Sequence, residues 1–513
     1  MTYKTLILFL CVKAAAILLL ITYGEIGLGP DEAQYWTWSR HPDWGYYSKP
    51  PGIAWEILLG TSVFGNTELG VRILPVAIGF ALPLALFFLA KQVRLSPSAC
   101  FWSAICFAAS PLGILSSFLA ITDGGMILFW ILACISLVGS VQRKEQPHYL
   151  LLGLYIGLGA LFKWPIYSLW LIVGGAWLLC PWIPSWRSLR NFAFGIFTSF
   201  LGLIPSVYWN ATHEWATFKH VLATLNGGHS PEIGPHTATA ANPIEFLGAQ
   251  ALLVSPILFI LLLLAWGRTL PSFKTLPKGI ALCGLSSLAL VAFGAAAACT
   301  MKMQGNWLVF AYPTAFVFLA WYACEYGKKK WMIAGVALSI VLGTIVYAIP
   351  SIQSHQLLAS WQIPYKVNPF RHNIGWNNLA SVLTEAGYQP DKDFLFADKY
   401  QTTSILSFYG PQQKQAYFLN LWEIRKNQFS FWPTMTDERV GKRGFFIVVE
   451  NVPQLNSETL SEKYLNKLKP YFTQVHFIGT RPLFHAYGKT VKGALIYECE
   501  GYNGKMPINP EKY

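Results

Sequence analysis

The sequence predicts a polytopic α-helical membrane protein with a smaller C-terminal α/β domain. Of its 513 residues, 54% are hydrophobic and only 12% are charged, whereas soluble domains carry about 25% charged residues. Apolar runs such as 257–266 are typical of membrane spans. After about residue 350 the pattern changes to short β-like runs between polar stretches. These observations exclude a soluble enzyme, a disordered chain and a nucleic-acid-binding protein.

Apolar stretches predict about 11 transmembrane helices, since a span needs roughly 20 apolar residues. No small-residue cleavage site follows the first stretch, so we expect a retained span rather than a removed signal peptide. The stretches at 149–162 and 165–181 are short, and a tilted or re-entrant pair is an alternative for them. The expected spans are 5–22, 71–90, 98–117, 122–140, 149–162, 165–181, 191–209, 244–266, 279–299, 307–325 and 331–349.

Lysine and arginine positions predict the orientation of these spans. Alternate loops are basic, as in the run Lys328–Lys330, and short basic loops stay in the cytoplasm. These basic cytoplasmic loops also account for the net charge of +13, so the charge does not require nucleic acid as a partner. We therefore expect a cytoplasmic N-terminus, a transmembrane domain at 1–350 with outer loops at 23–70 and 210–242, and an outer domain at 351–513.

The expected outer domain has a mixed pattern. Short β-rich runs at 393–398, 444–450 and 494–497 alternate with helix-like stretches such as 376–386. This alternation predicts a small soluble α/β domain.

The first outer loop begins with two adjacent carboxylates, Asp31 and Glu32, and continues with closely spaced aromatic residues. The spacing predicts a short amphipathic helix in the membrane interface, with the acids at its N-terminus. One interpretation is structural: Asp31 caps the helix, Glu32 lies in its first turn, and the aromatic residues form an ordinary interfacial belt. The other interpretation is functional, and ionisable residues elsewhere favour it.

Three further ionisable residues lie in or beside apolar stretches on the expected outer side, namely Asp123, Lys163 and Lys302. Each could be an anchor that reaches the lipid headgroups, but ionisable groups in a membrane are costly and indicate functional sites. Together, such lysines could hold a lipid-linked phosphate while a carboxylate deprotonates an attacking hydroxyl. Attack opposite the leaving phosphate would invert the anomeric centre of a transferred sugar.

The letters DEAQYW at 31–36, YYSKPP at 46–51 and KMQGNW at 302–307 resemble the GT-C membrane glycosyltransferases. Within this fold the sequence is similar to the group of protein O-mannosyltransferases, the lipid A aminoarabinose transferase and the rhizobial lipid A/core galacturonosyltransferases, the last being nearest. The stretch 396–409 of the outer domain also resembles these enzymes. The resemblance covers nearly the whole chain, and it is specific for fold and reaction but not for the sugar.

The resemblance implies roles for individual residues. Asp31 matches the catalytic Asp of the first outer loop, a general base, and Glu32 would support or orient it. Lys49 matches the Lys of the K-P motif and would contact the donor phosphate, with Tyr46 and Tyr47 near it.

Asp123 matches the acid of a second acidic site, which would contact the acceptor or a metal ion. Lys163 and Lys302 would be further contacts to the phosphate or sugar of the donor. The aminoarabinose transferase has a metal-binding acid where Ser48 stands here. We therefore assign no metal ligands, and a divalent metal ion stays an open alternative.

The function implied by the resemblance is transfer of a sugar from undecaprenyl phosphate to lipid A or the lipopolysaccharide core, at the periplasmic face of the bacterial inner membrane. Protein O-glycosylation is an alternative acceptor reaction. A flippase or transporter of the lipid-linked sugar is an alternative from another class, although we find neither paired repeats nor broken mid-membrane helices. Galacturonate as the sugar is favoured by the resemblance alone.

Two other groups of polar residues each allow two interpretations. His213, His220 and His229 lie in the outer loop at 210–242, whose pattern predicts an interfacial helix followed by a flexible lid, with a plain juxtamembrane helix as the alternative. The histidines do not have a convincing metal-binding spacing. Three arginines at 371, 425 and 481 are interpreted as solvated surface charges rather than as lipid headgroup contacts.

Overall fold

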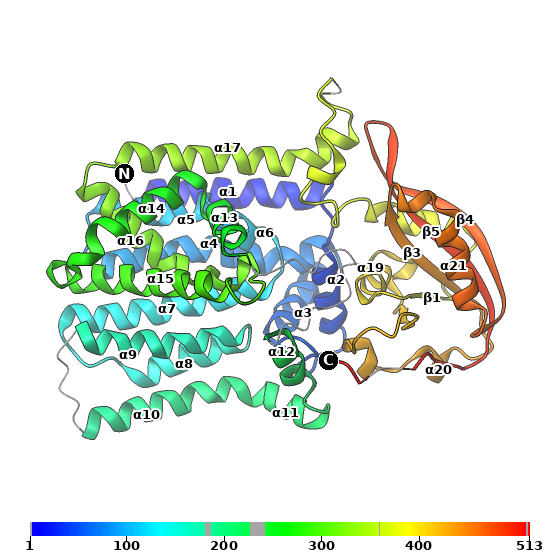
Figure 1. Cartoon of the computed structure of the whole chain (residues 1–513), viewed down its shortest axis with the longest axis horizontal. Coiled ribbons are helices and arrows are strands. Elements are labelled where there is room, and N and C mark those ends of the chain that lie inside the picture. Colours follow the sequence, from blue (N-terminus) through cyan, green and yellow to red (C-terminus); the bar gives the residue numbers. More distant parts are fainter. Residues whose placement is uncertain (1–2, 180–185, 226–241, 359, 509–510) are drawn as a thin grey trace.

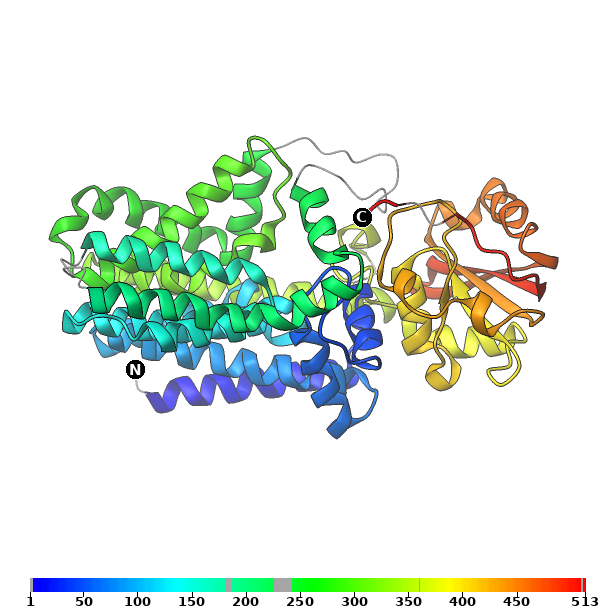
Figure 2. The same cartoon turned by 90° about the horizontal axis from the view of Figure 1, so that it is seen from below.

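A bundle of long helices and a five-stranded sheet lie at opposite ends of the molecule (Figures 1 and 2). The computed structural model describes residues 3–179, 186–225, 242–358, 360–508 and 511–513. The bundle end that faces the sheet is called the sheet-facing end below. The helices α2 (Pro30–Ser39), α3 (Gly52–Phe64) and α12 (Ala216–Leu225) lie there, between the bundle and the sheet.

Within the described residues, eight helical segments are long and apolar enough to cross a membrane, and nine if one bent pair is a single span. The eight are α1 (Tyr3–Tyr23), α4 (Glu68–Gln92), α7 (Thr122–Arg143), α10 with α11 (Trp186–Phe200, Ile204–Thr212), α14 (Pro256–Thr269), α15 (Lys278–Ala297), η4 with α16 (Gly305–Ala311, Tyr312–Glu325) and α17 (Lys329–Ser354). The bent pair is α5 (Pro97–Ala109) with α6 (Pro111–Phe118).

The expected count of about 11 also includes two shorter helices. α8 (Tyr149–Ala160) has 12 residues and α9 (Leu169–Leu179) has 11, less than a full crossing. A 3-10 turn, η1 (Trp164–Ser168), separates them. The stretch at 244–266 is also divided, into α13 (Pro243–Val254) and α14, at Ser255 with φ of 100°.

The helices α5 and α6 meet at a bend of 63°, and a lysine of α1 contacts α6 just after it. Pro111 begins α6 and lacks the N–H that would donate to the Phe107 carbonyl, which accepts from the Ser110 N–H and hydroxyl instead. Lys13 of α1 donates to the Gly113 carbonyl at 3.0 Å and to Ser117 Oγ at 2.8 Å. This cation inside the bundle therefore has a structural role.

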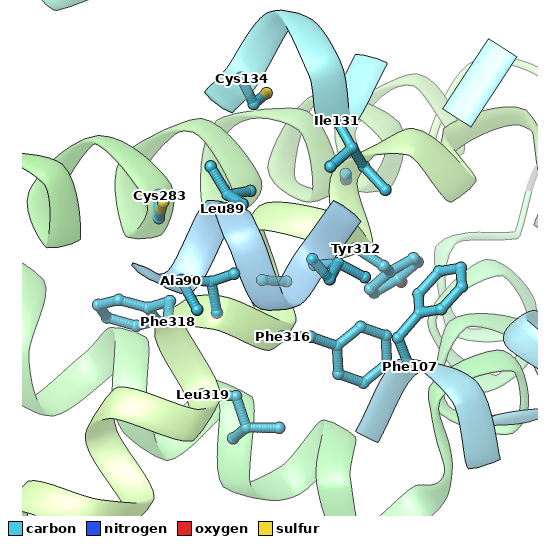
Figure 3. Close-up of a cluster of buried hydrophobic side chains, with 14 of the residues drawn as sticks. Leu89, Ala90, Phe107, Ile131, Cys134, Cys283, Tyr312, Phe316, Phe318 and Leu319 are labelled. Atoms are coloured by element: carbon cyan, nitrogen blue, oxygen red, sulfur yellow. The ribbon is translucent and has the colours of Figure 1, made fainter. Parts of the chain in front are cut away.

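The bundle core is formed by side chains from several spans. Figure 3 shows α4, α5, α7, α15 and α16 contributing to one cluster of buried side chains: Leu89, Ala90, Phe107, Ile131, Cys134, Cys283, Tyr312, Phe316, Phe318 and Leu319. Elsewhere in the bundle, glycines let two helices pack closely against each other. A Cβ on Gly153 of α8 would lie only 2.1 Å from the Gly195 carbonyl oxygen of α10.

The sheet has the strand order β2-β1-β3-β5-β4. β1 (Phe394–Ala397) pairs in parallel with β2 (Tyr417–Phe418) and β3 (Gly444–Asn451), whereas β5 (Lys489–Tyr502) is antiparallel to β3 and β4 (Phe472–Ala486). Its helices are α18 (Leu379–Glu385), α19 (Tyr400–Tyr409), α20 (Met435–Glu438) and α21 (Glu458–Leu468). This is the small C-terminal sheet domain that the alternating pattern predicts.

One face of the sheet packs against the first loop. Because side chains alternate along a strand, Leu395 and Ile447 share a buried cluster with Trp36 and Trp38 of α2. Their neighbours Phe394 and Phe446 face the opposite cluster, which contains Tyr464 of α21. The sheet therefore holds α2 from the side away from the bundle.

Candidate active site

The α2 N-terminus is fixed by a buried ion pair between Glu32 and Arg72 of α4. Arg72 Nε and Nη2 lie 2.9 and 2.7 Å from the two Glu32 oxygens, and the Arg72 and Glu32 side chains are 0% and 2% exposed. Glu32 also accepts from the backbone N–H groups of Gly29 and Ala120, each at 2.9 Å. Arg72 donates further to the carbonyls of residues 26 and 27.

This ion pair, called the brace below, positions two other carboxylates. Asp31 directly precedes Glu32, and Asp123 lies three residues after Ala120 at the start of α7. The two backbone N–H groups that Glu32 binds therefore lie two residues before Asp31 and three residues before Asp123. All four contacts of its carboxylate are to groups of the protein, so Glu32 is placed to orient its neighbour rather than to meet a substrate.

Asp31 lies close to Lys49 at the sheet-facing end of the bundle. Solvent reaches the Asp31 side chain although protein surrounds it. Its partial removal from water raises its pKa above the ordinary value, and the nearby positive charge of Lys49 opposes that rise. Burial and the charge of Lys163 lower the pKa of Lys49, while Asp123 and Asp31 act in the opposite sense.

Asp123 and Lys163 form the second ion pair of the site, with 2.7 Å between Oδ1 and Nζ. Their side chains are 5% and 13% exposed. Asn306 of η4 adds a long hydrogen bond of 3.5 Å from Nδ2 to Asp123 Oδ2. The structure therefore brings Asp31, Lys49, Asp123 and Lys163 together from three separate parts of the chain, and we call this group the mouth cluster.

A cavity of about 990 Å³ reaches Lys49 and Lys163 of the mouth cluster and extends into the bundle, whereas Asp31 and Asp123 are not among its lining residues. Lys49 and Lys163 line its polar end, together with Ser48 and His220. Its walls are apolar and come from α9, α12, α15, η4 and the segment before η4. They include Leu171, Ile172, Val221, Leu282, Leu285, Ala289, Leu290, Phe293, Met303 and Leu308. From Leu282 to Ala297 the wall follows α15 for about 22 Å. The shape and lining suit a long apolar chain with an anionic end.

The two tyrosines of the first loop are placed differently from the lysines. The Tyr46 ring is buried and stacks on Trp38 with 4.6 Å between ring centres, and its hydroxyl donates to the Trp38 carbonyl. Tyr47 is buried against His220, with 5.0 Å between ring centres. Neither tyrosine lines the cavity as the structure describes it. Tyr46 therefore shapes the loop that carries Lys49, and Tyr47 packs behind His220.

Lys302 is the candidate that the structure does not bring into the group. Its neighbours Met301 and Met303 line the cavity, but Lys302 does not. It forms no hydrogen bond or ion pair that we observe with another described residue.

The described residues also do not fit a metal site, because they contain no group of three or more His, Cys, Asp or Glu side chains arranged to hold an ion. Ser48, which lines the cavity next to Lys49, offers no carboxylate there.

Arg425 corrects one expectation from the sequence. It was expected to be a solvated surface charge, but its Nη1 lies 2.6 Å from His220 Nδ1, beside the cavity. No local pattern marks this residue, because the domain fold alone brings it to the bundle. Arg72 was also missed, although an arginine inside an apolar span is a usable signal. Of the expected lid, residues 226–241, with His229, lie outside the described part of the chain.

Comparisons with known proteins identify the family of the chain. The family described as dolichyl-phosphate-mannose-protein mannosyltransferase matches residues 48–209, a range that contains Lys49, Asp123 and Lys163. The lipid A galacturonosyltransferase RgtD of Rhizobium johnstonii is 30% identical over 334 residues, which cover 64% of this chain and 67% of RgtD.

Solved structures show the same fold. ArnT from Cupriavidus metallidurans in the apo state superposes with a TM-score of 0.60 at 14% identity, over 95% of this chain and 97% of that one. The structure of ArnT bound to undecaprenyl phosphate matches equally well, with a TM-score of 0.60 at 13% identity, over 96% and 98%. The chain therefore belongs to the GT-C family of integral membrane glycosyltransferases that contains the lipid A galacturonosyltransferase RgtD.

Proposed function

We propose that the protein transfers a sugar from a polyprenyl phosphate, undecaprenyl phosphate in bacteria, to lipid A or the lipopolysaccharide core. The observation that carries this proposal is the apolar cavity whose polar end is lined by Lys49 and Lys163. An isoprenoid tail is a long apolar chain ending in a phosphate, so the cavity matches it in both parts. The relatives support the same donor and acceptor, because RgtD is a lipid A galacturonosyltransferase and ArnT has been solved with undecaprenyl phosphate.

The mouth cluster supports an inverting displacement. Asp31 takes the proton of the acceptor hydroxyl, whose oxygen forms a bond to the anomeric carbon of the sugar. The bond from that carbon to the phosphate oxygen breaks on the opposite side, and polyprenyl phosphate leaves with one more negative charge. Lys49 and Lys163 stabilise this charge. The raised pKa of Asp31 makes it a better base than an ordinary Asp.

Glu32 and Asp123 have supporting roles in this proposal. Glu32, held by Arg72, orients the α2 N-terminus and hence Asp31. Asp123 pairs with Lys163 and so fixes the ammonium group at the cavity mouth. Lys302 has no assigned part.

We place the mouth cluster on the periplasmic side of the inner membrane. The supporting observation is the distribution of basic residues, since the loops at the bundle end away from the sheet contain Arg143, Lys274 and Lys328. The N-terminus is then cytoplasmic, residues 1–350 form the transmembrane catalytic domain, and 351–513 form a periplasmic domain that holds α2 and meets the acceptor.

Mass spectrometry of lipid A and core from cells with the gene, without it, and with Asp31→Asn tests the proposal. We expect one glycosyl mass to be present only with the unmodified protein. An unchanged lipid A and core profile in the deletion strain would contradict this acceptor assignment. The glycosyl mass would then be sought on envelope proteins, which are the acceptors in the alternative O-glycosylation reaction.

A further inference from the structure

Two buried side chains hold one peptide group of the first loop, the one that joins Tyr46 to Tyr47. The Thr217 hydroxyl of α12 donates to the Tyr46 carbonyl at 3.0 Å. Gln428, in η8 (Gln428–Phe431) of the sheet domain, accepts from the Tyr47 N–H through Oε1 at 2.7 Å. Thr217 is 2% exposed and Gln428 is 1% exposed. We call this pair the peptide clamp, because the peptide plane cannot rotate without breaking one of these two buried hydrogen bonds.

The Thr217 hydroxyl is oriented by Asn210 of α11. Asn210 Nδ2 donates to Thr217 Oγ1 at 3.0 Å, and Asn210 Oδ1 accepts from the Thr217 backbone N–H at 2.9 Å. Asn210 is fully buried. Since the Thr217 oxygen accepts from Asn210, its own hydrogen is available for the Tyr46 carbonyl. The bond to Tyr46 therefore has a fixed direction, which the turn between α11 and α12 sets.

The peptide clamp lies at the start of a short turn that carries Lys49. The Tyr46 N–H donates to the Lys49 carbonyl at 3.1 Å and closes this turn. After Lys49, two prolines restrict the backbone, and the Gly52 N–H donates to the Leu161 carbonyl at 2.7 Å. We observe no hydrogen bond or ion pair of the Lys49 ammonium with another residue in the described part of the chain. The backbone of the turn, rather than a partner of the ammonium, therefore sets the position of Lys49.

We propose that Thr217 and Gln428 are positioning residues that place the Lys49 ammonium at the polar end of the cavity. The inference rests on the proposed function, because it presupposes that Lys49 meets the phosphate of a polyprenyl donor. A turn freed at the Tyr46–Tyr47 peptide would let Lys49 move, and a misplacement of about 1 Å can cost about 100-fold in rate. The clamp thus links the phosphate contact to α12 on one side and to the sheet domain on the other.

The two members of the clamp differ in their access to the donor. Thr217 lines the cavity, so a direct contact with the donor is a competing explanation for any effect of its substitution. Gln428 is not among the described residues that line the cavity. A similar loss from both substitutions is therefore expected only if each acts through the turn that carries Lys49.

A double-mutant cycle with Lys49→Gln tests the inference. Undecaprenyl phosphate, which carries the charge of the leaving group, is titrated against the full-length protein in lipid nanodiscs. Thr217→Val and Gln428→Met each remove one hydrogen bond with little change of size, so we expect each to weaken binding about 3- to 10-fold. In the Lys49→Gln background the same substitutions should change the affinity by less than about 2-fold, because their effect acts through Lys49. Thr217→Ser, which keeps the hydroxyl, should bind like the unmodified protein.

Thr212→Val is the matched control, because the exposed Thr212 hydroxyl donates to the Trp209 carbonyl of its own helix at 2.9 Å. The affinity of this variant should not change, and thermal unfolding checks the fold of every variant. Equal losses with and without Lys49, a loss in Thr217→Val alone, or unchanged affinity in both clamp variants would overturn the inference and leave the proposed function intact. If the unmodified protein does not bind undecaprenyl phosphate, or Lys49→Gln binds it as tightly, the proposed donor contact fails and the inference fails with it.

Discussion

Asp31 and Glu32 are adjacent in sequence but belong to two regions with opposite properties. Glu32 is inside the brace, where Arg72 and two backbone N–H groups contact it and water is excluded. Asp31 is in the mouth cluster, where solvent reaches it and its pKa is raised. A carboxylate with all its partners in the protein is stable but inert, whereas one that lacks them can accept a proton from a substrate. The brace should thus control folding and the mouth cluster should control turnover.

The sharpest test of this division is Asp31→Asn. If Asp31 is the general base, kcat falls about 10²- to 10⁴-fold, because the amide cannot take the acceptor proton. Donor binding and thermal unfolding should change little. Single-turnover transfer assays and donor-binding titrations measure the two effects separately, and a variant that retains most of its kcat would break the comparison.

Glu32→Gln should show the opposite pattern. Removing one partner of a buried ion pair costs about 3–5 kcal/mol of unfolding free energy, since Arg72 keeps an uncompensated charge at 0% exposure. Thermal unfolding in detergent measures the loss. Glu25→Gln is the control, because the Glu25 side chain is 35% exposed and its pairing with His355 at 3.5 Å is loose. Equal stability of the two variants would refute a structural brace.

Lys49→Gln tests the cation of the mouth cluster. We expect kcat/KM for the donor to fall about 10- to 100-fold, the range for a lost hydrogen bond to a charged group. Stability should not fall, because burial and neighbouring cations already disfavour the charged lysine. Isotherms of donor binding, run beside thermal unfolding, distinguish this outcome from a loss of structure.

Ala289→Trp tests whether the cavity holds the lipid tail. Ala289 lines the wall on α15, and an indole there should raise KM for undecaprenyl donors about 10-fold, on the scale of a few lost apolar groups. Donors with short isoprenoid chains should be affected less. Ala292→Trp is the matched control on an exposed position of the same helix that is not part of the cavity lining. Identical KM values for both variants would contradict a tail site in the cavity.

The smallest expected effect is the pH dependence that Asp31 causes. A raised pKa in the folded state means that the contribution of Asp31 to stability is fully present below the unfolded pKa, about 3.9, and is lost as pH rises through the folded pKa. Asp31→Asn should therefore be slightly more stable than the unmodified protein near pH 7. In the unmodified protein kcat/KM should rise with pH through the raised pKa. Unfolding and rate profiles between pH 4 and 8 measure both trends, and a less stable Asp31→Asn at pH 7 would oppose this account.

Much of the fold could be predicted because local patterns carry it. Apolar length indicates the spans, and alternation in stretches such as 444–450 indicates strands. The helices α8 and α9 were harder to count, because a short apolar run in a bundle looks like part of a span.

Residues of the candidate site could be predicted where a charged side chain lies in a stretch of sequence that is otherwise apolar. Asp123 and Lys163 are charged residues at expected span ends, and Lys49 belongs to a motif of the first outer loop. The structure brings all three together with Asp31. The different environments of Asp31 and Glu32 could not be predicted, because neighbouring carboxylates share one sequence context. Arg425 could not be predicted either, since its position depends on how a whole domain packs against α12.

The shared core of α2 and the sheet has a consequence for biosynthesis. Trp36 and Trp38 are made early, but their partners Leu395 and Ile447 emerge only after the last span has been synthesised. Until then the helix that carries Asp31 has one uncovered apolar face, so its final position depends on the completed chain. An interrupted or truncated chain would thus insert most of its helices without the contacts that hold the helix carrying Asp31 in place.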